Sequence, residues 1–333
     1  MERSGERAGG GEGVGGVDGV LGIHHVTAIA SDPQRNVDFY AGVLGLRLVK
    51  VTVNYDDPGS YHLYYADGAG SPGTVLTFFP WPTAPRGRVG AGMASALAYA
   101  APSGSLGFWA ERLRGLGIES SVGTGRFGRD VLAAQDPDGM TVEIVADDAA
   151  PARVPWASAG VPGEHALRGF HSITLREATL DATSKTLTET LGFRAAGTEG
   201  TRHRFEAGGG GASAIVDVVL TGDPAPGRGA AGTFHHVAWR ARDDGHHEAL
   251  RGRIAAAGHR VTPVIDRTYF HAIYFREPGG VLFEVSTDGP GFATDEPAAT
   301  MGTRLVLPPH LEPRRAALEE TLPRLVLPGG VRP

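Results

Sequence analysis

Two pairs of adjacent histidines and one glutamate are the residues of this chain most suited to metal chemistry. The pair His24-His25 recurs as His235-His236, and Glu284 follows the second pair inside a short apolar run. Two histidines and one carboxylate are the minimal protein ligands of a non-haem iron(II) centre, whose other coordination positions stay open for substrate and dioxygen. Because these residues are far apart in the sequence, the surrounding elements must explain how they could meet.

The length and composition predict a soluble globular protein with two domains. The chain has 333 residues, of which 41% are hydrophobic and 20% charged, and its net charge is −6. A negative charge without a basic block argues against nucleic acid as a partner. The chain has no cysteine, which excludes thiolate ligands and disulfides. We find neither a signal peptide nor an apolar run of about 18 residues, and therefore expect a cytoplasmic protein without a membrane span.

Four copies of one module follow each other along the chain. The clearest copies are D-P-D-G-M-T-V-E-I-V at 136–145 and E-P-G-G-V-L-F-E-V-S at 277–286, where a turn with Pro and Gly precedes an apolar strand and a glutamate falls at the same place. The segments 72–79 and 212–219 fit this template more loosely. Aligning the copies places one residue of each in a shared column, which reads Thr77, Glu143, Asp217 and Glu284.

The beginnings of the modules also align. Runs rich in β-forming residues start the modules, at 22–30, 93–101, 169–175 and 233–239. An amphipathic segment follows each run, opens with Asp or Ser and closes with Gly, which are the usual cap residues of helices. The predicted helices span 32–45, 105–117, 181–192 and 243–258. Further short strands follow each helix, so every module is predicted to be β-α-β-β-β and the fold class to be α+β.

The modules also predict how the chain divides. Residues 1–20 are Gly-rich and expected to be disordered, and residues 149–167 hold several Pro and Gly and are expected to form a linker. The first half, with modules one and two, then covers 21–148, and the second half, with modules three and four, covers 168–288. Residues 289–333 form a C-terminal extension, in which 311–325 is expected to be a helix that packs on the body.

A family resemblance rests on three segments of the first module. They are H-H-V-T-A-I-A-S-D-P-Q-R-N-V-D-F-Y-A-G-V-L-G-L-R-L-V-K-V-T-V-N-Y-D-D-P at 24–58, Y-H-L-Y-Y-A-D at 61–67 and T-F-F-P-W at 77–81. With its four modules, the chain resembles the vicinal oxygen chelate superfamily (glyoxalases, bleomycin resistance proteins and extradiol dioxygenases). Within it, the chain is similar to the ring-cleaving dioxygenases that open hydroquinones. The resemblance implies that modules pair into two barrel-like cups, one of which holds a metal ion.

Only one histidine of each pair can face such a cup, because adjacent side chains on a strand point to opposite faces. The family pattern places the second member of each pair and the glutamate on the metal. These residues are His25, His236 and Glu284. In the hydroquinone subgroup the resemblance implies that the first module pairs with the fourth, which would bring the three together. Thr27 shares the face of His25, whereas His24 and His235 should point away unless a bulge re-aims them.

His171 is an alternative first ligand, because many two-domain ring-cleaving dioxygenases build their site from the last two modules. The histidine pairs of modules one and four match each other and His171 is single, which favours His25. A pairing of modules two and three would gather His171, Asp217 and Glu143, which are adequate ligands for a second divalent ion. Because the second module has no histidine at its start, we favour a cup without metal and a structural role for His171.

The segment between His236 and Glu284 contains groups that suit chemistry beside a metal. The positions that the family implies next to the ligands are Arg267, Tyr274, His235, Thr27 and His24. Tyr274 could donate to a bound oxygen. Arg267 could stabilise an anionic oxygen or hold Tyr274 in place, unless it only forms a surface ion pair with Asp266.

Other histidines receive weaker interpretations. His62 either lines the pocket or packs in the core, and His271 and Tyr269 are pocket candidates without an assigned role. His246 and His247 lie at a helix start beside two aspartates, which predicts a solvated surface.

Together these features predict an iron(II)-dependent dioxygenase that inserts both atoms of dioxygen next to a hydroxyl of a hydroquinone-type ring. Manganese(II) suits the same ligands. The expected partners are a small aromatic diol and dioxygen, and the fold is compatible with a homo-oligomer. Three alternatives stay open: a glyoxalase-type lyase or isomerase, which generally uses four ligands and would lack one at Thr77; a thiol transferase; and a non-enzymatic drug-binding protein of the same fold.

Overall fold

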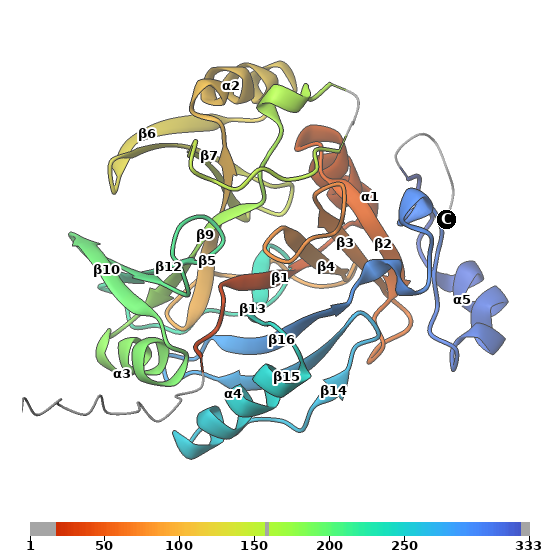
Figure 1. Ribbon diagram of the computed structural model, residues 1–333. Coiled ribbons are helices and arrows are strands. Elements are labelled where there is room, and N and C mark those ends of the chain that lie inside the picture. The colour runs from red at the N-terminus through yellow and green to blue at the C-terminus, as the bar shows by residue number, and fades with distance from the viewer. Residues whose placement is uncertain (1–17, 157–159, 328–333) are drawn as a thin grey trace, which may run out of the picture.

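The computed structural model describes residues 18–156 and 160–327, with the side chains of 124 and 125 left aside (Figure 1). Most of the tail predicted to be disordered, 1–20, lies outside the described residues. Its last residues are described, and Val20 is buried. All strands of the described chain belong to two mixed eight-stranded sheets, which lie beside each other in Figure 1. No helix in this part of the chain is long and apolar enough to cross a membrane.

The first sheet joins the first module to the fourth, as the resemblance implies. Its strands, in spatial order, are β14 (Ile265–Asp266), β15 (Phe270–Arg276), β16 (Leu282–Pro290), β13 (Thr233–Ala241), β1 (Ile23–Ala30), β4 (Val75–Pro80), β3 (Tyr61–Ala66) and β2 (Arg47–Val53). The antiparallel pair β1–β13 lies at the centre and joins the two modules. Ligands from the two ends of the chain can therefore meet within one sheet.

The second sheet joins the second module to the third in the same way. Its strands, in spatial order, are β10 (Arg194–Glu199), β11 (Arg202–Glu206), β12 (Ile215–Leu220), β9 (Phe170–Glu177), β5 (Met93–Ala101), β8 (Thr141–Ala146), β7 (Arg129–Gln135) and β6 (Ser120–Arg126). The central antiparallel pair is β5–β9. The two sheets are thus pseudo-symmetric copies, each built from two β-α-β-β-β modules, which confirms the α+β fold of four modules.

One helical segment follows the first strand of each module, as the sequence predicts. These segments are α1 (Pro33–Val37) with its π-helical continuation η1 (Asp38–Val43), η2 (Ser103–Ser105) with α2 (Leu106–Gly115), α3 (Asp181–Lys185) with η4 (Thr186–Thr190), and α4 (Asp244–Ala256). The Asp32 and Asp243 carboxylates accept hydrogen bonds from backbone N–H groups of the first turns of α1 and α4. Ser105, also a predicted cap, makes no such bond.

The histidines at the start of α4 correct one prediction. His246 and His247 are buried, with exposed fractions of 8% and 1%, instead of lying on a solvated surface. His247 Nε2 lies 2.9 Å from the carbonyl oxygen of Val285 on β16, to which it donates a hydrogen bond. The first turn of α4 thus faces the sheet, and the neighbouring aspartates that suggested a surface act as helix cap and first-turn residues.

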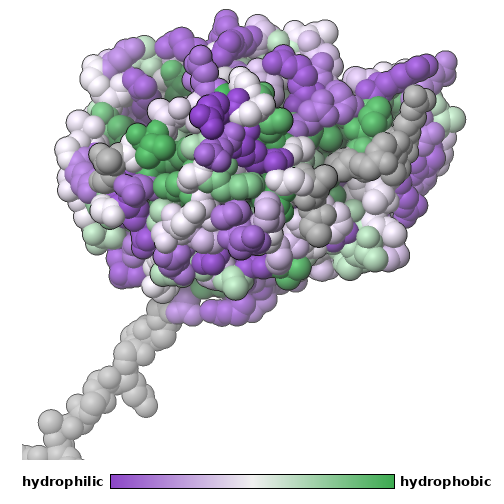
Figure 2. Space-filling model, turned by 90° about the horizontal axis from the view of Figure 1, so that it is seen from above, coloured by the Kyte–Doolittle hydropathy of each residue, from purple (hydrophilic) through white to green (hydrophobic). Residues whose placement is uncertain are grey.

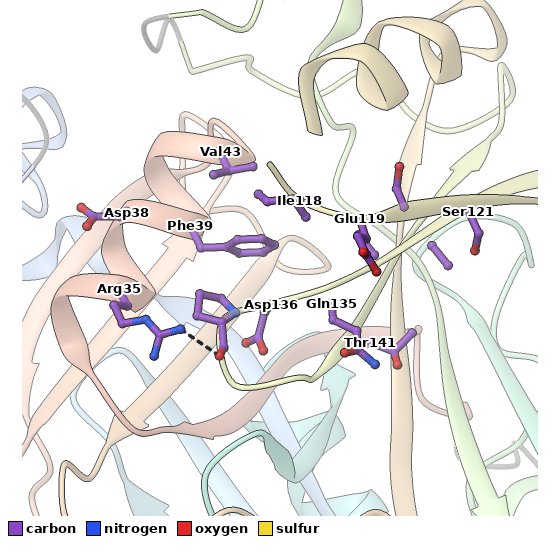
Figure 3. A pocket seen from close by; sticks show the side chains of 14 residues that line it. Arg35, Asp38, Phe39, Val43, Ile118, Glu119, Ser121, Gln135, Asp136 and Thr141 are labelled. Atoms are coloured by element: carbon purple, nitrogen blue, oxygen red, sulfur yellow. Dashed lines mark hydrogen bonds between the residues drawn. The ribbon is translucent and has the colours of Figure 1, made fainter. Parts of the chain in front are cut away.

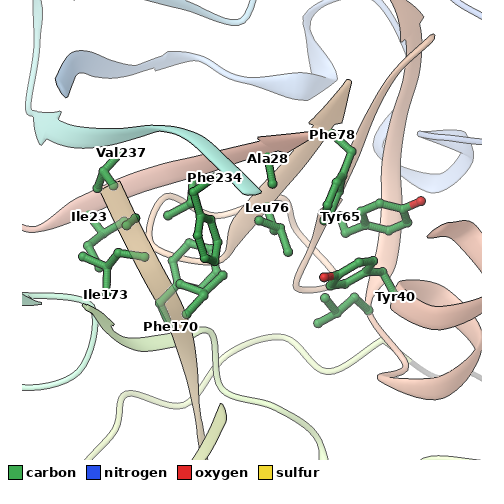
Figure 4. Packing of buried hydrophobic residues seen from close by; sticks show 14 of the residues in the cluster. Ile23, Ala28, Tyr40, Tyr65, Leu76, Phe78, Phe170, Ile173, Phe234 and Val237 are labelled. Atoms are coloured by element: carbon green, nitrogen blue, oxygen red, sulfur yellow. The ribbon is translucent and has the colours of Figure 1, made fainter. Parts of the chain in front are cut away.

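The core between the two sheets is one continuous apolar cluster. Figure 4 shows Ile23 and Val237 of the first sheet packed near Phe170 and Ile173 of the second. Every position of β1 is buried, because one face of this strand lines the cup and the other faces the core. On the face seen in Figure 2, apolar residues form separate patches among polar ones.

The C-terminal extension packs against the first module. Its short helices are η5 (Phe292–Thr294), η6 (Ala298–Thr300), η7 (Glu312–Arg314) and α5 (Arg315–Thr321), and a further turn, η3 (Gly163–His165), lies between the halves. The helix predicted at 311–325 is therefore shorter than expected, but Leu318 and Leu322 join the main core. The division of the sequence into halves at 149–167 stays a prediction, since each sheet takes one module from either half.

Candidate metal centre

Three neighbouring strands of the first sheet carry the predicted ligands. Thr27 of β1 pairs with His236 of β13, and His25 pairs with Ala238 two residues further along. Ala238 in turn pairs with Glu284 of β16, which runs parallel to β13. These registers place two imidazoles and one carboxylate on the same concave face.

The ligand atoms converge as a metal site requires. The Nε2 atoms of His25 and His236 lie 3.3 Å apart, and Glu284 Oε2 lies 3.5 Å from the first and 2.9 Å from the second. All three side chains are buried. Ser286 Oγ donates to Glu284 Oε1 at 2.6 Å, whereas Oε2 is buried without an aligned hydrogen-bond donor. A divalent cation fits this set, because it would satisfy the orphaned oxygen and both imidazoles at once.

Two β-bulges explain how both histidines of each pair can lie close to the metal site. In the pairing of β1 with β13, Ile23 faces Trp239 and His25 faces Ala238, so His24 is an extra residue on β1. A second register shift makes His235 the extra residue on β13. Bulges re-aim side chains, and here they override the simple alternation. His235 lines the pocket, contrary to the simple expectation, whereas His24 is buried outside the pocket lining.

The histidine that is extra in each bulge contacts the candidate ligand that follows it in the sequence. The Nδ1 atoms of His24 and His25 lie 2.9 Å apart, and those of His235 and His236 lie 2.8 Å apart. A metal-binding histidine usually donates its free ring N–H to a neighbour, which fixes the ring orientation. Burial and the nearby His25 lower the pKa of His24 to about 3, and desolvation and His236 lower the pKa of His235 to about 3. Both rings are therefore neutral acceptors at physiological pH.

The electrostatics of the ligand set favour an ionised carboxylate. Burial alone would raise the pKa of Glu284, but the adjacent His25 and His236 outweigh it and hold the pKa well below its ordinary value. Burial lowers the pKa of His236 despite the opposing effect of Glu284. A neutral imidazole and a carboxylate are the forms that bind a cation.

The ligands lie in the wall of a cavity of about 360 Å³ with a largely aromatic lining. The residues around it are His25, Thr27, Asn54, Tyr55, Asp56, His62, Tyr64, Phe79, Trp81, His235, His236, Arg267, Phe270, Tyr274, Leu282 and Glu284. The rings of Phe79 and Trp81 are stacked, with an interplanar angle of 10°. The cavity therefore offers flat apolar walls to a small planar ring, with the polar ligands at one side.

Arg267 and Tyr274 form a pair inside this cavity. Arg267 Nε donates to the Tyr274 hydroxyl at 3.2 Å, and its guanidinium lies 5.4 Å from the Tyr274 ring centroid. The other end of Arg267 approaches Asp56 at 3.5 Å. Asp266, the surface partner considered from the sequence, instead accepts a bond from the backbone of Thr268. Burial and Glu284 raise the pKa of Tyr274, so its phenol stays protonated.

Two of the candidate pocket residues lie elsewhere. His271 Nδ1 contacts Asp244 on α4 at 2.6 Å, and the Tyr269 hydroxyl donates to Asp295 of the C-terminal extension. Neither lines the cavity. His271 alternates away from Phe270 and Tyr274 along β15, and Tyr269 lies in the bend just before this strand. His62 does line it. Sequence reasoning gave no role to Asn54, Tyr55 and Tyr64, although they belong to the segments that carry the family resemblance.

The second sheet places His171 in a different environment. His171 is the extra residue of a bulge in β9, so its counterpart is His24, and Ser172 stands where His25 stands in the first sheet. Its Nδ1 lies 3.0 Å from Ser172 Oγ. Arg126 donates to Glu143, and two arginines, Arg202 and Arg204, donate to Asp217. The carboxylates of this cup are thus neutralised by arginines, which favours a structural role for His171.

A larger cavity, of about 870 Å³, lies between η1 and the strands β6 to β8 (Figure 3). It contains Arg35, Phe39 and Asp136 and shares no lining residue with the cavity at the histidines. Asp136 accepts a bond from the Tyr40 hydroxyl at 3.0 Å, and burial raises the pKa of Asp136 to about 6. Within the described chain, only His25, His236 and Glu284 form a cluster suited to a metal ion, so the smaller cavity is the candidate site.

Comparisons with known proteins agree with this fold and site. The model of the Glyoxalase/Bleomycin resistance protein/Dioxygenase superfamily matches residues 22–144 and 169–285, and the chain belongs to this superfamily. Maize (Zea mays) glyoxalase I shares the fold, with a TM-score of 0.60 at 13% identity over 80% of this chain and 92% of that one.

More similar relatives lie among the ring-cleaving dioxygenases. The chain is 45% identical over 90% of its length to a Bacillus subtilis (strain 168) protein provisionally named ring-cleaving dioxygenase MhqO, and covers 95% of it. It is 37% identical, over 90% of its length and 95% of the relative, to chlorohydroquinone/hydroquinone 1,2-dioxygenase of Sphingobium indicum. A Bacillus subtilis crystal structure, provisionally described as a dioxygenase, superposes with a TM-score of 0.89 at 44% identity, covering 92% and 98% of the two chains. The resemblance inferred from the sequence is thereby confirmed.

Proposed function

We propose that this chain is an iron(II)-dependent dioxygenase that opens the ring of hydroquinone-type diols next to a hydroxyl. The observation that carries the proposal is the convergence of His25, His236 and Glu284 in the wall of a small aromatic cavity. The relatives named as ring-cleaving dioxygenases, one of them for chlorohydroquinone and hydroquinone, support the reaction and the class of substrate.

His25, His236 and Glu284 would hold the metal on one face. When bound, iron(II) would supply open positions for the diol and dioxygen and the capacity to pass an electron between them. Manganese(II) could take the same place. The protein's part is to orient the ring, because Phe79 and Trp81 present flat walls to it, and to hold the two ligand rings through His24 and His235.

Arg267 and Tyr274 would stabilise negative charge on the reacting oxygens. Because Arg267 Nε donates to the Tyr274 oxygen, the phenol's own hydrogen is left to donate, either to the Glu284 carboxylate beside it or to an oxygen bound in the cavity. The raised pKa of Tyr274 makes it a donor instead of a base. The fixed charge of Arg267, partly shielded by Asp56, adds to the same effect. These two residues would therefore act on the oxygen atoms, whereas His25, His236 and Glu284 would hold the metal.

The position of Thr77 weakens the lyase alternative. A glyoxalase-type site generally takes a carboxylate from each paired module, and Thr77 occupies the position that corresponds to Glu284. Its hydroxyl lies 2.8 Å from the Thr27 hydroxyl, so it is engaged in a hydrogen bond. A three-ligand site leaves more positions open, which favours oxygen chemistry. The thiol transferase and drug-binding alternatives have no feature of their own in the cavity. A cytoplasmic location and a homo-oligomer stay predictions.

The test is oxygen uptake by protein that has been loaded anaerobically with iron(II). We expect uptake with methylhydroquinone and hydroquinone and a new absorbance from the opened ring, and less activity after loading with manganese(II). Uptake with catechol alone would keep the dioxygenase class and contradict the substrate class. One bound iron per chain without uptake of oxygen with any diol would contradict the proposal and return attention to the lyase and thiol transferase alternatives.

A further inference from the structure

Four hydrogen-bonding side chains of the first module form a connected chain next to the metal ligands. The Thr27 and Thr77 hydroxyls lie 2.8 Å apart, and Thr77 Oγ1 lies 2.9 Å from His62 Nε2. His62 Nδ1 in turn lies 2.8 Å from the Tyr64 hydroxyl. Thr27, Thr77 and Tyr64 are buried, and Thr27 is two residues from His25 on the same face of β1. One end of this hydrogen-bonded chain, Thr27, therefore lies beside the metal ligands.

The buried tyrosine sets the direction of these hydrogen bonds. In the described part of the protein, His62 Nδ1 is the only hydrogen-bond partner of the Tyr64 hydroxyl. A buried O–H without an acceptor is costly, so Tyr64 donates and Nδ1 accepts. A neutral imidazole that accepts at Nδ1 carries its hydrogen on Nε2, and it must then donate to Thr77.

The same reasoning continues to the cavity. Because Thr77 Oγ1 accepts from His62, its one hydrogen is available for Thr27 Oγ1. Thr27 then accepts from Thr77 and retains its own hydrogen as a free donor. Thr27 lines the cavity beside His25 and Glu284, so this donor is available to an oxygen atom bound there.

One member of this hydrogen-bonded chain, Thr77, occupies the position where the pseudo-symmetry predicts a fourth metal ligand. Thr77 of β4 pairs with Thr27 of β1, just as Glu284 of β16 pairs with Ala238 of β13, and β4 and β16 are corresponding strands of their modules. Threonine in place of a carboxylate leaves that side of the centre open. The hydroxyl of Thr77 instead connects the centre to His62.

We propose that His62, Tyr64 and Thr77 are positioning residues that fix Thr27 as a hydrogen-bond donor to the ionised hydroxyl of the bound diol. This inference rests on the proposed function and adds residues to it. Thr27 would stabilise the negative charge that the ring hydroxyl acquires when it loses its proton. Hydrogen bonds to charged groups are stronger than those between neutral groups, so loss of the enforced direction should disfavour the ionised form.

The direction of these hydrogen bonds can be tested without measuring enzyme turnover. Zinc-loaded full-length protein labelled with ¹⁵N-histidine should show His62 as the neutral tautomer with its hydrogen on Nε2, assigned by the loss of its signal in His62→Gln. Tyr64→Phe removes the donor to Nδ1 and should change the His62 nitrogen shifts. Tyr65→Phe is the matched control, because Tyr65 is the next residue of β3 and its hydroxyl donates to Asn36 instead. Hydrogen on Nδ1, or a charged ring, would overturn the proposal.

Kinetics with iron-loaded protein and methylhydroquinone test the effect on the substrate. Thr77→Val should keep iron content, lower kcat/KM about tenfold or more, and shift the acid limb of the pH profile upward by about one unit. Thr52→Val is the matched control, because Thr52 is buried opposite His62 and its hydroxyl has no partner among the described residues. His62→Gln keeps an N–H donor and should be less impaired than His62→Leu.

The outcomes separate this inference from the proposed function. If the unsubstituted protein consumes oxygen but Thr77→Val behaves like Thr52→Val, the role of the chain is wrong and the function stands. If the unsubstituted protein consumes no oxygen with any diol, the proposed function fails, and with it the role of Thr27 toward a diol. A change of acid limb in Thr77→Val and in Tyr64→Phe, but in neither control, would support the proposal.

Discussion

At the candidate metal centre, the two histidines of each adjacent pair have different tasks. His25 and His236 direct Nε2 into the cup, and the residue before each one contacts its Nδ1 atom. A ligand ring that is held at Nδ1 cannot rotate freely, so the orientation of both rings is set before any metal arrives. The same arrangement occurs on both sides of the cup because both central strands carry a bulge.

Glu284 is the ligand whose loss should be most informative. We expect Glu284→Gln to reduce bound iron to below about a tenth of the unsubstituted value, because the amide is neutral and a weaker ligand. Iron per chain, measured by elemental analysis, is the readout. Glu143→Gln is the matched control, since Glu143 holds the same column position in the second sheet and pairs with Arg126. Equal iron content in the two variants would contradict the assignment of the ligand.

Tyr274 should affect turnover without affecting the metal. Tyr274→Phe removes the donor that Arg267 holds in place, and we expect roughly a 100-fold decrease in kcat at unchanged iron content. Steady-state oxygen uptake measures this effect. Tyr99→Phe serves as the control, because the Tyr99 hydroxyl is buried in the second sheet without a hydrogen-bond partner among the described residues. Kinetics of Tyr274→Phe equal to those of Tyr99→Phe would remove this phenol from the mechanism.

For single residues, the sequence predicts which side chains come together better than it predicts their orientation. The repeated histidine pairs and the column that ends in Glu284 indicated the cluster, and the family resemblance selected the second histidine of each pair and the pairing of the first module with the fourth. The bulges could not be predicted, because an extra residue in a strand is decided by its pairing with the neighbouring strand. His235 was therefore expected to point away. The burial of His246 and His247 could not be predicted for a similar reason, since the side of a helix that faces the sheet depends on tertiary packing.

Among the elements, the C-terminal extension is held by a buried charge cluster. Lys50 of β2 has no exposed surface, and its Nζ lies 2.5 Å from both Asp295 and Glu296. Its ammonium also lies 4.9 Å from the ring centroid of Tyr269. The cluster thus connects a strand of the first module to the segment that follows the fourth. An ion pair of this kind contributes mainly because a single partner cannot be left alone in the interior.

Removal of Lys50 should therefore be costly. We expect Lys50→Met to lower the free energy of unfolding by about 3–5 kcal/mol, because the buried Glu296 would lose its shorter ion pair and keep only Arg304, at 3.5 Å. Urea denaturation followed by circular dichroism gives this value. Arg315→Met is the comparison, since Arg315 pairs with Glu312 on the surface and should cost about 1 kcal/mol or less. Similar losses in both variants would show that the Lys50 cluster is not a buried anchor.

The elements themselves could largely be predicted from local patterns. The aspartates at 32 and 243 cap their helices as expected, and the Pro-Gly turns precede β8 and β16. The ends were harder, as the predicted helix at 311–325 shows, because only the packing of Leu318 and Leu322 against the core decides which turns persist. The order of the strands within a sheet could not come from propensity at all, and it entered through the family resemblance.

At the scale of the whole molecule, the two sheets meet at a pair of buried carboxylates. Glu177 at the end of β9 packs against Gly279 in the turn between β15 and β16, close to Glu277. Burial and the charge of Glu277 raise the pKa of Glu177 from 4.5 to about 8. Because the folded protein holds this proton more tightly than the unfolded chain, stability decreases as the pH rises from about 4.5 toward 8.

Replacing the Glu177 carboxylate should show how much its ionisation destabilises the folded protein. Glu177→Gln should leave the unfolding free energy nearly unchanged at pH 5 and raise it at pH 8.5 by an amount on the order of a few kcal/mol. Thermal unfolding of both proteins at the two pH values measures the difference. Glu189→Gln is the control, since the Glu189 side chain is 67% exposed. A gain for Glu177→Gln that is equal at both pH values would contradict the titration.

The pairing of the first module with the fourth also has a consequence for how the protein is made. The two ligand histidines are 211 residues apart, and the glutamate lies further along still. Contacts of such long separation form late, after the intervening segments are available. On the ribosome, a growing chain would therefore expose only one of the three ligands until the fourth module emerges. A metal ion could then be captured only at the end of synthesis, and a truncated chain would lack the complete set of ligands.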